Sequence, residues 1–250
     1  MSRAKLTRNV APGIHLLSHA FVNCYLVEGE SGVLLVDAAL PRTWPYLAQA
    51  LRAIDRDEED LRAVALTHAH FDHLGFAQLL QTHGVPIYGH VADAAIAAHP
   101  YSYAHENPRL LYPLRHPRGL RPLGAMTAAG ALNVPGVRGL LPLTAESAAL
   151  LPGHPQLVFC PGHTDGHCAL YFPDRSALLV GDALVTFDPY TGARGPQIVA
   201  GAATANSDLA LHSLDALADT GARIVLPGHG APWKHGIESA VVRARAAGAS

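Results

Sequence analysis

The sequence predicts an α/β protein in which two mixed β-sheets pack face to face and helices cover their outer faces. Two observations support this fold class. The expected elements run in the order of several strands, a βα unit, several more strands and a closing αβα unit. Residues 63–66 are all apolar, which is typical of a strand buried on both faces. The chain has 250 residues, of which 49% are hydrophobic, enough for a substantial core, so we expect one domain over residues 1–250.

The first part of the chain alternates strand and helix signals. Residues 21–28 and 33–36 are apolar runs separated by Gly-Glu-Ser-Gly, a hairpin signal. Residues 41–55 carry apolar side chains at the i, i+3, i+4 and i+7 spacing of a helix that lies on a sheet. The strand at 63–66 then leads into a histidine-rich segment. After that segment we expect a helix over residues 74–82, a strand over 86–88 and a helix over 91–98.

The rest of the chain begins with a long irregular stretch. Residues 99–155 are rich in Pro, Gly and Leu and show no clear periodicity, so we interpret this region as a lid or substrate loop. Five side chains in or near it are candidates to cover an apolar pocket or to donate to an oxyanion: Tyr101, Tyr103, His105, Tyr112 and Tyr190. Beyond it we expect strands over residues 157–160, 168–172 and 177–180, a helix over 207–218, a strand over 223–226 and a helix over 234–247.

Charge, hydrophobicity and cysteine content limit the classes of partner that the protein is expected to bind. The net charge is −2 and the basic residues form no cluster, which argues against nucleic acid. Every apolar stretch is far shorter than the ~20 residues that span a bilayer, and no secretion signal is evident, so we expect no membrane partner. Three cysteines (Cys24, Cys160 and Cys168) lack paired spacing, which favours a reducing, cytoplasmic location. A small-molecule substrate remains the expected partner.

The segment at residues 67–73 concentrates metal-competent side chains. Three imidazoles and one carboxylate lie within six residues, on a turn between a buried strand and a helix: His68, His70, Asp72 and His73. Packing several imidazoles together is costly unless a cation or carboxylates compensate them. Residues two apart in extended backbone point the same way, so His68 and His70 can converge on one ion while the next two face another. Asp72 also fits the N-cap of a helix that starts at His73.

Three later turns each place one more such side chain after an apolar run. His163, Asp182 and His229 all lie next to glycine, which lets the backbone crowd a small site. Taken singly, each is commonly a turn former or a surface imidazole. Together with the earlier segment they make five histidines and two aspartates, the ligand count of a hydrolytic site with two metals.

In its H-x-H-x-D-H segment and in the order of the later residues, the chain resembles the metallo-β-lactamase superfamily, in particular the dinuclear metallohydrolases such as glyoxalase II and the lactonases. The resemblance implies an αββα sandwich. It implies that His68, His70 and His163 hold a first metal. It further implies that Asp72, His73 and His229 hold a second metal, that Asp182 bridges the two, and that Asp37 orients an imidazole ligand from behind.

The resemblance also implies an activity. Imidazole and carboxylate ligands without cysteine suit zinc first, and also manganese or iron. Two divalent ions can share a hydroxide that attacks the carbonyl of a small carboxylic ester, lactone or thioester, while Asp72 takes or relays the proton.

Several alternatives stay open at this point. Asp182 disfavours a true β-lactamase, and Ala183, Leu184 and Val185 stand where quorum-sensing lactonases carry a tyrosine. Only 21 residues follow His229, too few for the helical domain with which glyoxalase II enzymes bind glutathione thioesters. A persulfide dioxygenase with one iron, a β-lactam or phosphodiester hydrolase, and a non-enzymatic metal-binding scaffold are the remaining candidates.

Overall fold

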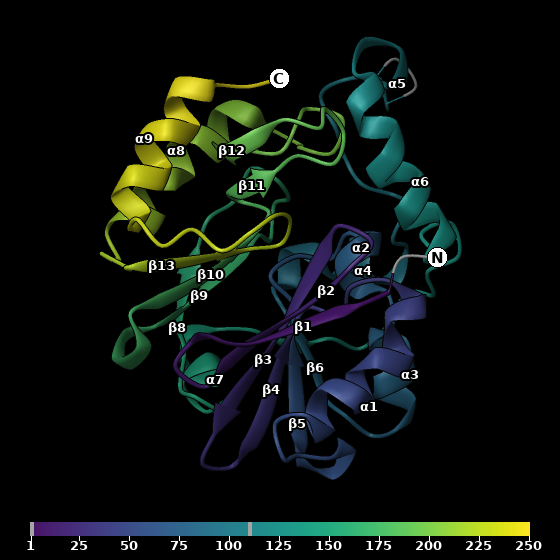
Figure 1. The fold of residues 1–250 in the computed structure, drawn as a ribbon, viewed down its shortest axis with the longest axis vertical. Coiled ribbons are helices and arrows are strands. Elements are labelled where there is room, and N and C mark those ends of the chain that lie inside the picture. The colour runs from purple at the N-terminus through teal and green to yellow at the C-terminus, as the bar shows by residue number, and fades with distance from the viewer. Residues whose placement is uncertain (1–2, 110–111) are drawn as a thin grey trace.

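The computed structural model describes residues 3–109 and 112–250 and contains two main β-sheets (Figure 1). The first is a seven-stranded sheet in the order β1-β2-β3-β4-β5-β6-β7. The pairs from β1 to β4 are antiparallel, and the pairs from β4 to β7 are parallel. The strands span Lys5–Ala11, Ile14–His19, Val22–Gly29, Gly32–Val36, Leu61–Ala65, Ile87–Gly89 and Leu141–Pro142.

The second sheet has four strands in the order β13-β10-β9-β8. Strand β10 is parallel to β13 and antiparallel to β9, which in turn is antiparallel to β8. A small two-stranded sheet, β11-β12, stands beside it. These strands span Gln156–Phe159 (β8), Cys168–Phe172 (β9), Ala177–Gly181 (β10), Val185–Phe187 (β11), Arg194–Gln197 (β12) and Ile224–Pro227 (β13).

Helices lie on the outer faces of both sheets. In Figure 1, α1 and α3 cover the seven-stranded sheet, and α8 and α9 cover the four-stranded sheet on the opposite side of the molecule. The helices are α1 (Trp44–Arg52), α2 (Phe71–Leu74), α3 (Ala77–Thr82), α4 (Ala94–Ala98), α5 (Tyr112–Arg115), α6 (Leu120–Ala128), α7 (Ala145–Ala149), α8 (Ser207–Ala218) and α9 (Ile237–Ala247). None of the helices in the described ranges is long and apolar enough to cross a membrane.

Three buried clusters follow from the alternation of side chains along the strands. In β4, Val33 and Leu35 pack with the helices α1 and α3, whereas Leu34 and Val36 face the other sheet. In β10, Leu179 joins that same central cluster, and Leu178 packs with α8 and α9 instead. The central strands of each sheet are therefore buried on both faces, which is why β4 and β10 are almost wholly apolar. The expected αββα sandwich is confirmed.

The expected elements are found with small shifts at their ends, and several were not foreseen. The strands at 168–172 and the helix at 207–218 have the predicted bounds. The helix expected over 41–55 begins as a 3-10 turn at Pro41 and is α-helical only over Trp44–Arg52. Strand β1 was missed because its side chains are mostly polar and partly exposed, as befits an edge strand.

The region 99–155, expected as an irregular lid or substrate loop, contains α5, α6, β7 and α7. Helix α6 escaped prediction because Pro122 and Gly124 interrupt its sequence. Pro122 is tolerated there because the first turn of a helix has no intrahelical partner for its backbone N–H groups. Strand β7 pairs with β6 and so extends the seven-stranded sheet.

The carboxyl ends of five strands converge at one end of the sandwich. Asp37 follows β4 and the histidine-rich segment follows β5 in the first sheet. His163, Asp182 and His229 follow β8, β10 and β13 in the second. The two sheets thus deliver their metal-competent side chains into one space between them.

Candidate metal centre

The loop after β5 positions four of the candidate side chains. His68 and His70 lie on extended backbone, and the short helix α2 begins at Phe71 with His70 at its N-cap position. Asp72 is therefore inside the first turn, and the alternative reading of Asp72 as the cap of a helix starting at His73 is wrong. A backbone hydrogen bond from Ala38 N to His73 O, 2.7 Å long, ties this turn to the end of β4.

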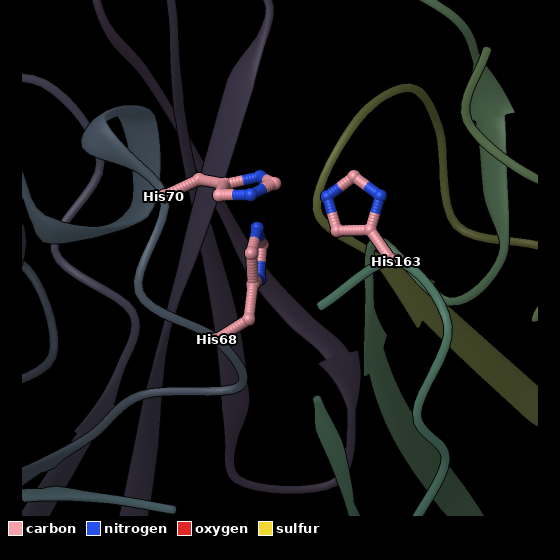
Figure 2. Close-up of side chains that lie close together, drawn as sticks. All are labelled: His68, His70 and His163. Atoms are coloured by element: carbon pink, nitrogen blue, oxygen red, sulfur yellow. The ribbon is translucent and has the colours of Figure 1, made fainter. Parts of the chain in front are cut away.

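The first group of three imidazoles surrounds one point. Ligand nitrogens of His68, His70 and His163 lie within 4.8 Å of one another, close enough to hold one ion. The ring centres are 4.8 Å apart for His68 and His70, 4.8 Å for His68 and His163, and 4.6 Å for His70 and His163. Figure 2 shows His68 and His70 coming from one side of the gap and His163 from the other.

The second group contains Asp72, His73 and His229, whose ligand atoms also lie within 4.8 Å of one another. Asp182 stands between the two groups. Its Oδ1 is 3.4 Å from His73 Nε2, and its Oδ2 is 3.2 Å from His229 Nε2 and 3.6 Å from His163 Nε2. The structure thus brings together all seven residues singled out in the sequence, and one carboxylate touches both groups.

Hydrogen bonds on the far side of the rings fix how the imidazoles face. His73 Nδ1 is 3.0 Å from Asp37 Oδ2, which confirms the orienting role expected of Asp37. His229 Nδ1 donates to the carbonyl of Phe21, at 2.8 Å. The Nδ1 atoms of His68 and His163 lie 3.1 Å and 3.2 Å from threonine hydroxyls. Because Nδ1 is engaged in all four rings, Nε2 is the atom turned toward the centre.

The electrostatics of the first group favour neutral imidazoles. Burial and the neighbouring imidazoles hold the pKa of His68 and of His70 well below the usual range. For His163, burial outweighs the attraction of Asp182 and lowers the pKa to about 3. Neutral imidazole is the form that ligates a metal, so these three rings need lose no proton to do so.

The second group is charged. Burial alone would lower the pKa of His73, but the charges of Asp182 and Asp37 raise it to about 9. In the same way, burial of His229 is outweighed by Asp182 and Asp72, which raise its pKa well above the usual range. The pKa of Asp72 is lowered: burial opposes ionisation, yet the hydrogen bond to His229 and the nearby imidazoles prevail. Asp72 is therefore an ionised carboxylate at neutral pH.

The donor atoms fit metal ions better than they fit one another. In the described part of the chain, six buried side-chain N or O atoms have no hydrogen-bond partner, and five of them belong to this centre. Such orphaned groups are costly unless something satisfies them. Four imidazole nitrogens and one carboxylate oxygen form the donor set that zinc and related divalent ions prefer. The five atoms are Nε2 of His68, His70, His73 and His163, and Oδ1 of Asp182.

The backbone beside Asp182 has no room for a side chain. A Cβ atom at Gly228 would collide with Asp182 Oδ1 and would lie 2.6 Å from His73 Cε1. Glycine at this position therefore allows the turn that carries His229 to approach the shared carboxylate. This close approach is the crowding that the flanking glycines predicted.

Two further residues support the centre and were not singled out in the sequence. His167 is fully buried, its Nε2 accepts a 3.1 Å hydrogen bond from Asp182 N, and its Nδ1 lies 3.2 Å from Cys160 Sγ. Asp93 accepts hydrogen bonds from Ala69 N at 3.0 Å and from Thr164 Oγ1 at 2.8 Å. His167 therefore holds the backbone of Asp182 in place, and Asp93 joins the two loops that carry the first group.

A sequence signal for His167 did exist. His167 follows His163 in the run Gly162-His163-Thr164-Asp165-Gly166-His167. The signal is this second Gly-His pair beside a candidate ligand. Asp93 offered no comparable signal because its partners, Ala69 N, Gly166 N and Thr164 Oγ1, are brought near only by the tertiary fold.

Replacing His167 with phenylalanine is expected to destabilise the protein. The ring volume is kept, but the Asp182 N–H loses its acceptor in a buried setting, which costs about 1–3 kcal/mol. Thermal unfolding should shift down by about 2–10 °C, as scanning calorimetry would measure. The matched control is His212→Phe, on the exposed surface of α8. Equal unfolding temperatures for both variants would refute the supporting role of His167.

The chain belongs to the metallo-β-lactamase superfamily, because the family model of that superfamily matches residues 18–229. The matched span contains every residue of the two groups. Family membership and the His/Asp groups together support a metal-dependent hydrolase.

Individual relatives agree with the family. The chain is 26% identical over 250 residues to the probable metallo-hydrolase YflN of Bacillus subtilis, covering 89% of this chain and 85% of that protein. Among solved structures it is similar to the metallo-beta-lactamase family protein TTHA1429 of Thermus thermophilus, with a TM-score of 0.68, 26% identity, and 93% and 78% of the two chains covered. It also resembles TTHA1623 in a di-iron-bound form, with a TM-score of 0.59, 27% identity, and coverage of 87% and 92%.

Proposed function

We propose that this protein is a dinuclear metallohydrolase that cleaves a small carboxylic ester, lactone or thioester. One observation carries the proposal: two groups of three ligands share Asp182, whose carboxylate lies within 3.6 Å of imidazoles in both groups. When bound, two divalent ions would supply Lewis acidity and a hydrolytic water with a lowered pKa.

The residues of the chain have distinct roles in this proposal. His68, His70 and His163 form one ion site, and Asp72, His73 and His229 form the other, with Asp182 common to both. Asp37 holds His73 through Nδ1, which keeps Nε2 aimed at the centre.

Asp72 is the proposed catalytic base. It is ionised, is 7% exposed, and lies at the centre with Oδ2 3.3 Å from His229 Nε2. It can therefore accept the proton that the attacking water loses and pass it to the leaving group.

A pocket of about 230 Å³ beside the centre supports a small substrate. His70 and His163 form part of its wall, so a group bound in it lies next to the first ion site. Small apolar side chains form much of the remaining wall, which suits a short acyl or alkyl group. They are Ala92, Ala95, Ile96, Ala104 and Ala205.

Zinc is the proposed metal, since imidazole and carboxylate ligands without sulfur suit it, and manganese and iron suit the same set. The chain is similar to a protein known in a di-iron-bound form, so iron is also a candidate metal. Elemental analysis of protein purified without added metal would identify the ion.

Activity would be tested on the metal-loaded protein with a panel of lactones, thioesters, aryl esters, phosphodiesters and a β-lactam. We expect turnover of at least one carboxylic ester, lactone or thioester, and its loss on chelation with dipicolinate. Turnover of the phosphodiester or β-lactam alone would contradict the proposed substrate class. Oxygen uptake on glutathione persulfide, with one iron per chain, would replace hydrolysis by dioxygenase chemistry.

A further inference from the structure

The sixth buried atom without a hydrogen-bond partner in the described part of the chain is Arg109 Nη2. Arg109 lies on the loop between α4 and α5, and its Nε donates to the carbonyl of Ala202 at 3.0 Å. Nη2 of the same guanidinium is buried, and its N–H groups have no hydrogen-bond acceptor in the described part of the chain. A guanidinium stays charged at any physiological pH, so this position holds an uncompensated positive charge.

No carboxylate in residues 3–109 and 112–250 forms an ion pair with Arg109. Other arginines in the described part of the chain have such partners: Arg56 pairs with Glu28 and Asp60, and Arg245 with Asp215. Both pairs are partly open to solvent, where ion pairs matter less. Arg109 is also only partly exposed, but its buried Nη2 has no carboxylate to pair with.

Arg109 is connected to the metal centre through Tyr103. The guanidinium carbon lies 4.0 Å from the centre of the Tyr103 ring, a cation–π contact. The same ring lies 3.8 Å from the centre of the His70 imidazole, a member of the first ligand group. One aromatic side chain therefore separates the unpaired positive charge from the ion site.

Tyr190 completes the surroundings of the guanidinium. Both its ring and that of Tyr103 pack on the cluster of Val185, Val199 and Ala203. Tyr103 and Tyr190 each carry a phenol O–H group that can donate a hydrogen bond.

We propose that Arg109, Tyr103 and Tyr190 form a subsite that binds a carboxylate carried by the substrate, away from the bond that is cleaved. A carboxylate accepts two parallel N–H bonds from a guanidinium and a further bond from a phenol, which matches the donors present. The inference rests on the proposed function and narrows it: the substrate is an anionic ester, lactone or thioester.

Two matched pairs of esters test the subsite. The 4-nitrophenyl monoester of adipic acid and the 4-nitrophenyl ester of hexanoic acid differ by a carboxylate on the acyl side. 4-Acetoxybenzoate and its methyl ester differ by a carboxylate on the leaving group. The metal-loaded protein should favour the charged member of at least one pair.

Arg109→Gln should lower kcat/KM for the favoured charged ester by about 10- to 100-fold and for its neutral partner by less than about threefold. Arg109→Lys keeps the charge without the planar fork and should lie between. The matched control is Arg62→Gln, which removes an exposed guanidinium whose Nε likewise donates to a carbonyl, that of Ser31. An equal loss on charged and neutral esters, or no loss, would overturn the subsite.

A binding measurement separates failure of the subsite from failure of the proposed reaction. Titration calorimetry with adipate, hexanoate and inorganic phosphate needs no turnover. Adipate should bind the wild-type protein at least about tenfold more tightly than it binds Arg109→Gln, and more tightly than hexanoate binds the wild type. If no ester is cleaved but adipate still binds the wild type more tightly than Arg109→Gln, the result supports the subsite and contradicts the proposed reaction class. Equal adipate affinity in both proteins, or phosphate binding as tight as adipate, would refute a substrate carboxylate at Arg109.

Discussion

Replacing Asp182 with asparagine is expected to reduce the bound metal from the two proposed ions per chain to one or fewer and to lower kcat/KM by about 100- to 1,000-fold. The asparagine keeps the size of the side chain but removes the negative charge that faces His73, His163 and His229. Removing one partner from a buried charged arrangement costs about 3–5 kcal/mol, and about 1.4 kcal/mol corresponds to a tenfold change in rate.

Elemental analysis and steady-state kinetics on the same preparation measure both effects. Asp174→Asn is the matched control, because Asp174 is exposed in the turn between β9 and β10 of the same sheet. Calorimetric unfolding of each variant tests whether the fold survives. A folded Asp182→Asn protein with two metals and wild-type kcat/KM would contradict the role of Asp182 as a ligand shared by both ions.

Removing the metal should destabilise the protein strongly. Four imidazole nitrogens and one carboxylate oxygen at the centre have no hydrogen-bond partner within the described chain, and the ions would satisfy them. A ligand that binds only the folded state at about 1,000 times its Kd adds about 4 kcal/mol to the free energy of unfolding. For a chain of this size that corresponds to a rise of about 8–16 °C in Tm.

Scanning calorimetry of the metal-free protein, before and after zinc is added back, measures this shift. His70→Ala should lose most of it, because the first ion site then lacks one of its three imidazoles. His83→Ala is the control, since His83 is exposed at the end of α3. An identical Tm with and without metal would show that the cluster of imidazoles is stable on its own.

Much of the fold was predictable because its strands are short apolar runs and its longer helices have clear periodicity. Strand β9 and helix α8 are of this kind, and the sequence placed them with the correct bounds. The seven candidate ligands were predictable for a related reason: they follow strands whose carboxyl ends meet at one end of the sandwich.

The region 99–155 was not predictable because contacts distant in sequence hold it. The Tyr101 hydroxyl donates to Ala131 O at 3.0 Å and accepts from Val134 N at 2.7 Å. Glu106 accepts a hydrogen bond of 2.8 Å from Ser207 N, at the start of α8. No local pattern encodes such pairs, so the placement of Tyr103 and Arg109 beside the centre could come only from the structure.

The supporting residues show the same limit on a smaller scale. His167 acts on Asp182 through a backbone N–H, and Asp93 acts on two loops through Ala69 N and Thr164 Oγ1. Residue type and spacing identify a ligand because several ligands share one ion. They do not identify a residue whose partners are backbone groups or hydroxyls that only the tertiary fold brings near.

The central claim is that His68, His70 and His163 hold one metal ion, that Asp72, His73 and His229 hold a second, and that Asp182 binds both. Anomalous diffraction from crystals of the zinc-loaded protein, collected on both sides of the zinc absorption edge, tests it most directly. We expect two peaks roughly 3.5–4 Å apart, each within about 2.2 Å of the ligand atoms of its own group and both within reach of the Asp182 carboxylate. A single peak, or a second peak bound by other residues, would contradict it.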